Sequence, residues 1–182
     1  MKTKYLFVIL KVFFVFLTIA DLSILSANPI SYTWMDRDRQ QVIYLNPNLI
    51  AELPSSLVRK DKNPRIIANL DSKLKAAITK GALPKSHANN YSEVFEETEG
   101  GRKMTLPGDI FVEFDLSWSE SKVKEWAILQ NLSIVQKLTS TRNIYRIKTN
   151  PGIECLHLAN RLLAQEGVKS AFPNWWRESS VR

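Results

Sequence analysis

The fold of the second half of the chain is decided by the stretch Asp109-Ile-Phe-Val-Glu-Phe-Asp115. Apolar and polar side chains alternate along most of it, which is typical of a β-strand with one buried face. Ile110, Val112 and Phe114 are expected to point into a core, and the side chains between them toward the opposite face. The pair Pro107-Gly108 directly before the stretch indicates that a structural unit begins at about residue 106.

The residues after this strand predict two helices and three further strands. Ser117 or Ser119 can cap a helix, and Glu120 follows Ser117 at the spacing of a capping box. Asn150-Pro-Gly152 can end a strand and open a second helix, which Gly167 can end. The first expected helix runs from Ser117 or Ser119 to about Asn131. The elements that follow are strands over Leu132–Leu138 and Ile144–Lys148, a helix over Ile153–Gln165 and a strand over Val168–Phe172.

The resulting order is β-α-β-β-α-β, the plan of a ferredoxin-like split βαβ module. We therefore expect an α+β fold in which two helices cover one face of a four-stranded antiparallel sheet over residues 106–174. Residues 28–105 have weaker periodicity and predict a small irregular α/β region before the module. Its expected elements are a hairpin of Ser31–Met35 and Gln41–Leu45, a short helix over Asn69–Lys80, and a hairpin of Ser92–Glu96 and Lys103–Leu106.

Residues 1–27 have the pattern of an export signal. A basic start precedes an apolar stretch from Tyr5 to Ala20, and cleavage is expected after Ala20 or Ala27. If the segment is not cleaved, it would act as an N-terminal anchor, because the residues from Tyr5 to Leu25 nearly suffice to span a bilayer. We expect an exported protein, periplasmic or secreted, with anchoring in the inner membrane as the alternative.

The composition argues against most catalytic and nucleic-acid-binding classes. Of 182 residues 45% are apolar, and the net charge is +7, but the basic residues are scattered, so no nucleic-acid surface is expected. The single cysteine, Cys155, excludes an intramolecular disulfide, and its helical position predicts a core side chain. Since His87 and His157 are the only histidines and no metal or nucleophile motif is present, we expect no metal, no cofactor and no enzymatic activity.

The sheet face opposite the two predicted helices has no cover within residues 106–174. Half of the eight side chains expected on it are apolar, which suggests a surface for a protein partner. The alternative is that residues 28–105 fold over it. The eight residues are Phe111, Glu113, Val135, Lys137, Ile144, Arg146, Lys169 and Ala171.

Four segments resemble the N-terminal prodomain of bacterial subtilisin-like serine proteases. The most specific resemblance is the ending Gly167-Val-Lys-Ser-Ala-Phe-Pro-Asn-Trp-Trp176, which follows the helical segment Leu158-Ala-Asn-Arg-Leu-Leu163. The others are Leu106-Pro-Gly-Asp-Ile-Phe-Val-Glu-Phe114 and Thr149-Asn-Pro-Gly152. The resemblance covers residues 91–176 well and residues 32–53 faintly.

The resemblance implies a module that restrains or folds a protease. In such prodomains the open sheet face docks on two surface helices of the protease, and the segment after the last strand lies in the active-site cleft like a cleaved product. Pairing of this segment with the edges of the cleft would supply backbone hydrogen bonds. A disordered C-terminus is the alternative for these residues. The segment comprises Trp175, Trp176, Arg177, Glu178, Ser179, Ser180, Val181 and Arg182.

The chain departs from this family because it contains no catalytic Asp, His or Ser motif. We therefore expect an inhibitor or folding chaperone of a subtilisin-like serine protease that acts in trans. Two alternatives stay open. One is an envelope-anchored ferredoxin-like interaction module, and the other is a truncated remnant of a subtilisin-like protease gene.

Overall fold

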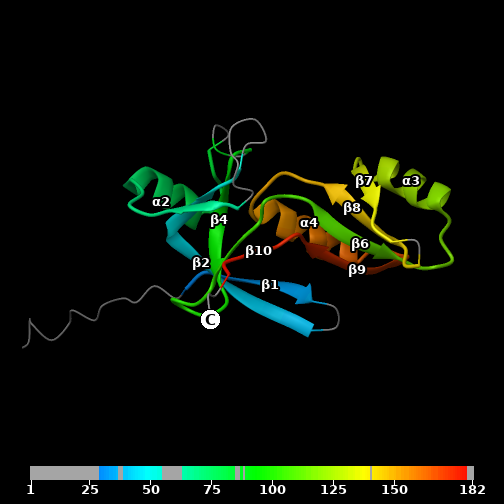
Figure 1. The fold of residues 1–182 in the computed structure, drawn as a ribbon, viewed down its shortest axis with the longest axis horizontal. Helices are drawn as coiled ribbons and strands as arrows, with labels where there is room; N and C mark the ends of the chain where they lie inside the picture. Colours follow the sequence, from blue (N-terminus) through cyan, green and yellow to red (C-terminus); the bar gives the residue numbers. More distant parts are fainter. Residues whose placement is uncertain are drawn as a thin grey trace, which may run out of the picture.

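A computed structural model of the chain describes residues 29–36, 39–54, 63–84, 87, 89–139 and 141–179 (Figure 1). The predicted signal or anchor segment, residues 1–27, lies outside the described residues. The last three residues of the predicted tail, Ser180, Val181 and Arg182, also lie outside them.

The first of two sheets is built mainly from residues before 106. Its strand order is β1-β2-β4-β5-β10, with β3 paired to β2, and every pairing is antiparallel. Both predicted hairpins, β1–β2 and β4–β5, are confirmed. The short helix α2 (Ser72–Thr79) packs on β2. The strands are β1 (Ser31–Asp36), β2 (Arg39–Glu52), β3 (Arg65–Ile67), β4 (Tyr91–Glu96), β5 (Lys103–Thr105) and β10 (Trp176–Arg177).

The second sheet has the antiparallel order β7-β8-β6-β9. Two helices accompany it, α3 (Glu120–Leu129) after the first strand and α4 (Ile153–Leu163) after the third. Of the two predicted caps, Ser119 is the one used, since its Oγ accepts from the backbone N–H of Lys122 at 3.2 Å. The strands are β6 (Ile110–Phe114), β7 (Ser133–Lys137), β8 (Ile144–Lys148) and β9 (Val168–Pro173).

This architecture corrects the fold class expected from the sequence. The described residues form an α+β mixed fold of three helices and two mostly antiparallel sheets, not a two-helix, four-stranded ferredoxin-like module preceded by a small irregular region. The first sheet depends on pairs far apart in sequence, such as Leu45 with Phe95. Its strand β4 is buried from Ser92 to Glu96, so it lacks the alternation that reveals a half-exposed strand.

Helix α4 joins the two sheets into one hydrophobic core. It packs on β6 and β9 of the second sheet and also contacts β1 of the first, and Figure 1 shows it where the sheets meet. The Asn160 side chain donates to the Thr33 carbonyl at 2.8 Å, and the Tyr32 and His157 rings lie 6.1 Å apart. Cys155 is fully buried in this helix, which confirms the predicted core position.

Candidate functional site

The open face of the second sheet is positioned by strand β6 at its centre. Phe111 pairs with Arg146 on β8 and with Phe172 on β9, and Glu113 pairs with Ile144 and Ser170. Since residues paired in register lie on the same face, these side chains share the face opposite the buried Val112. Of the eight residues predicted there, the structure brings together Phe111, Glu113, Ile144 and Arg146.

The other four predicted residues are placed differently because β7 and β9 each contain an irregularity. Ala171 pairs with Val112 and is only 3% exposed, so it belongs to the core. Lys169 falls at the irregularity in β9 and forms an ion pair with Asp115 at 3.5 Å.

On β7 the irregularity lies between Ile134 and Gln136, at Val135. Lys137 then pairs with the buried Tyr145, and its Nζ lies 5.6 Å from the centre of that ring. Gln136, rather than its predicted neighbours, lies beside Arg146 on the open face. The residues missed by the sequence reasoning are therefore Gln136, Ser170 and Phe172, and local alternation holds no signal for the two irregularities.

An aromatic pair occupies the middle of the corrected face. The ring centres of Phe111 and Phe172 are 5.5 Å apart, and both side chains are half-buried. On one side, the Glu113 carboxylate accepts from Arg142 and from the Ser170 hydroxyl, at 3.4 Å for the latter. An apolar centre with a polar surround is the arrangement common in protein–protein interfaces.

The charged groups of the face are held by these contacts. Arg146 donates to the Gln136 side chain at 3.3 Å and lies 3.7 Å from the Asp109 carboxylate. The hydrogen bond and the negative charge of Glu113 raise the pKa of Arg142 above its ordinary value. The two hydrogen bonds to Glu113 orient the Arg142 guanidinium beside the aromatic pair.

The described residues before 106 lie beside this face rather than across it. Contacts between the first sheet and residues 106–174 run mainly through α4 and β9. Phe111, Glu113 and Arg146 make their ring, hydrogen-bond and ion-pair contacts within residues 106–174. The described part of the N-terminal region therefore does not favour the alternative in which this region covers the face.

The predicted tail is bound within the molecule as far as the structure describes it. Trp176 and Arg177 form strand β10 on the edge of β5, and the backbone N–H of Glu178 donates to the Lys103 carbonyl at 2.9 Å. The Trp175 ring lies 5.6 Å from Trp34. As far as it is described, the segment thus forms a paired strand at one edge of the first sheet, next to β5 (Figure 1).

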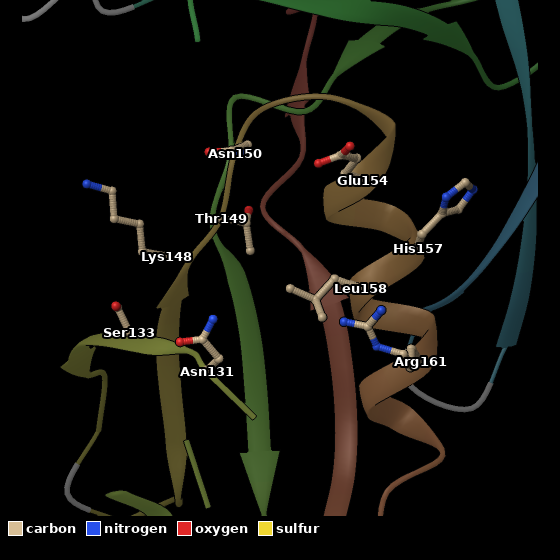
Figure 2. A pocket seen from close by; sticks show the side chains of 9 residues that line it. All are labelled: Asn131, Ser133, Lys148, Thr149, Asn150, Glu154, His157, Leu158 and Arg161. Carbon is tan, nitrogen blue, oxygen red and sulfur yellow. The ribbon is translucent and has the colours of Figure 1, made fainter. Parts of the chain in front are cut away.

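A polar pocket of about 560 Å³ lies between the end of β8 and α4 (Figure 2). Its charged side chains are Lys148, Glu154 and Arg161, and the two cations make no ion pair with any residue that the structure describes. In Figure 2 Lys148 extends from one rim while Arg161 lies on the far wall beside Leu158. Because the charged groups are separated and of mixed sign, this pocket favours no particular class of ligand.

Further candidate features of the described residues are Cys155, the metal-ligand side-chain types and the helices. Burial raises the pKa of the Cys155 thiol to about 11, and its Sγ lies 3.2 Å from the Asp109 carbonyl oxygen. No three His, Cys, Asp or Glu side chains in the described part of the chain are grouped as metal ligands. None of the helices described has the length and apolar character needed to cross a bilayer.

The described residues thus define an α+β protein of two joined antiparallel sheets, and its candidate site is the open face of the second sheet. Comparison of the chain with protein-family models, curated proteins and solved structures gives no match.

Proposed function

We propose that the chain is an exported, prodomain-like binding protein of a subtilisin-like serine protease, acting in trans as its inhibitor or folding chaperone. The observation that carries the proposal is the Phe111–Phe172 pair on a sheet face otherwise held by ion pairs. The resemblance of residues 91–176 to subtilisin prodomains supplies the class of partner. In this proposal the chain does no chemistry of its own and acts by occupying the surface of the protease.

The face can contribute affinity in two ways. Covering the two half-buried phenylalanine rings removes apolar surface from water. Each Å² of apolar surface buried in this way contributes roughly 25 cal/mol of favourable binding free energy. Arg142 and Arg146 lie at the borders of this apolar centre, and Arg142 already donates two hydrogen bonds to the Glu113 carboxylate. Arg142 therefore loses less freedom when a partner docks, which reduces the cost of ordering an interface.

Replacing Phe111 with glutamate is expected to weaken binding to the protease by at least about tenfold. The new carboxylate would lie next to Glu113 on the same strand face and would lose its hydration in the interface without a partner. The measurement is calorimetric titration of the mature chain into a subtilisin-like protease from the same genome, inactivated at its catalytic serine.

The matched control is Leu129→Glu. Leu129 is 83% exposed at the end of α3, so the same charge is added to a solvated site on a helix. Its affinity is expected to equal that of the unaltered chain. If the unaltered chain binds none of the subtilisin-like proteases of the genome, the proposed function is refuted. If the Phe111→Glu variant binds as tightly as the unaltered chain, the sheet face is not the binding surface.

A further inference from the structure

The edge of β5 is a built binding site for an extended segment, and strand β10 occupies it. The register places Trp176 opposite Thr105 and Arg177 opposite Met104. One residue further on, the Glu178 backbone N–H donates to the Lys103 carbonyl at 2.9 Å. The backbone edge by which residues 176–178 pair with β5 is therefore already occupied in cis.

Side chains of the same segment are also held by the first sheet. The Trp175 ring lies 5.7 Å from Phe95, edge to face, and 5.6 Å from Trp34. Lys103 Nζ lies 3.4 Å from the Glu178 carboxylate. Arg177 lies over the Trp34 ring, 5.9 Å from its centre. A segment held in this way cannot lie in another protein's cleft at the same time.

This attachment is much weaker than the core that surrounds it. The strand is two residues long, and the Lys103–Glu178 ion pair is well exposed, so the pair contributes little. Trp175 is only half-buried, and its indole N–H is shielded from water without a hydrogen-bond partner among the described residues. Local release of residues 175–178 should therefore cost far less free energy than unfolding the sheets.

We propose that β10 is an exchangeable strand: the β5 edge stores residues 175–178 in cis, and a bound protease competes for them with its cleft. The proposal rests on the proposed function, since it concerns the tail of the same binding protein. Docking by the sheet face would raise the effective concentration of the cleft around the tail and draw it off β5. Only molecules whose tail is free can fill the cleft, so the apparent inhibitory potency equals the intrinsic potency multiplied by the fraction of molecules with a free tail.

The test locks the strand with a reversible cross-link. The double variant Lys103→Cys/Glu178→Cys places two thiols at positions that face each other across the antiparallel pair. Both native side chains are half-exposed, so the thiols are open to oxidation. Cys155 is fully buried and does not compete for oxidation. Inhibition of peptide hydrolysis by the active protease, and binding to the serine-inactivated protease, are measured for the oxidised and the reduced variant.

We expect the oxidised variant to bind through its sheet face but to inhibit hydrolysis at least about tenfold less than the reduced variant. The reducing agent should restore inhibition. The Lys103→Ser/Glu178→Ser variant controls for the lost ion pair and should inhibit equally well with and without reducing agent. In the unaltered chain, the Lys103 amide donates to the Glu178 side chain at 3.5 Å, so its protection from hydrogen exchange should fall when the protease draws the tail off β5.

The outcomes separate the two proposals. Equal inhibition by the oxidised and reduced forms, with binding retained, would overturn strand exchange and leave the docking face standing. Unchanged protection of the Lys103 amide in the complex would overturn it as well. Loss of binding in every form, the unaltered chain included, would overturn the proposed function and strand exchange with it.

Discussion

Replacing Gly152 with alanine is expected to lower the free energy of unfolding by about 4 kcal/mol, the sum of backbone strain and a steric clash. Gly152 precedes α4 with φ at +91° and ψ at −165°, a conformation that is essentially restricted to glycine. A Cβ at this position would lie 2.5 Å from Oε2 of Glu93, and that carboxylate is held in the core.

The matched control is Gly100→Ala. Gly100 also has a positive φ, +70°, but no atom lies within 4 Å of the position that its Cβ would take. Its replacement should therefore cost only about 1 kcal/mol of backbone strain. Urea unfolding of both variants, followed by tryptophan fluorescence, measures the difference. Equal losses of stability would show that the approach of Glu93 to Gly152 places no constraint on this junction.

Replacing Glu93 with alanine is expected to lower the free energy of unfolding by about 2 kcal/mol at neutral pH. Glu93 lies on β4 of the first sheet and is 3% exposed, and its Oε2 accepts from the backbone N–H of Ile153 at 3.1 Å. Helix α4 has no side-chain cap at its own Gly152, so this carboxylate caps the helix from the other sheet. Alanine would leave the N–H buried and unpaired beside a cavity.

The free energy of unfolding should depend on pH through the protonation of Glu93. Burial raises the pKa of this carboxyl, its hydrogen bonds oppose the shift, and the negative charge of Glu154 adds to it. The folded protein therefore holds the proton to higher pH than the unfolded chain. Stability from this group is greatest below the ordinary glutamate pKa and falls as pH rises through the raised value.

Glu93→Gln separates the cap from the charge. Its side-chain carbonyl can still accept from Ile153, while the cost of burying a carboxylate is removed. We expect this variant to be at least as stable as the unaltered chain at neutral pH and to lose the decline in stability with rising pH. Urea unfolding of both proteins at several values from about pH 5 to about pH 8 provides the measurement. Parallel pH profiles would contradict a raised pKa at Glu93.

Within residues 106–174 the elements could be predicted because their signals are local. The alternation of Ile110, Val112 and Phe114 reflects burial of one face of β6, and all three are fully buried. The turn residue Gly152 and the cap Ser119 lie where the predicted helices begin. Each of these signals depends on neighbours a few residues away, and the sequence displays such neighbours directly.

The composition of the open face could be predicted only in part. Phe111, Glu113, Ile144 and Arg146 lie on β6 and β8, which pair without interruption. The irregularities in β7 and β9 shift the inward–outward alternation of side chains by one residue. On β9 the open face therefore carries Ser170 and Phe172, while the predicted Ala171 points into the core. An irregularity of this kind is set by the fit between strands, so the register cannot be read from either strand alone.

The sequence by itself determined the order of helices and strands from Leu106 to Pro173, the buried place of Cys155 and the two hairpins of the N-terminal region. Only the tertiary structure decided that these hairpins form one sheet, that Glu93 caps α4 across the junction, and that Trp176–Arg177 pairs with β5. The physical reason is the range of the interactions. Hydrogen-bonded turns and side-chain periodicity act over a few residues, whereas the last two contacts join residues 60 or more positions apart, through a shared core.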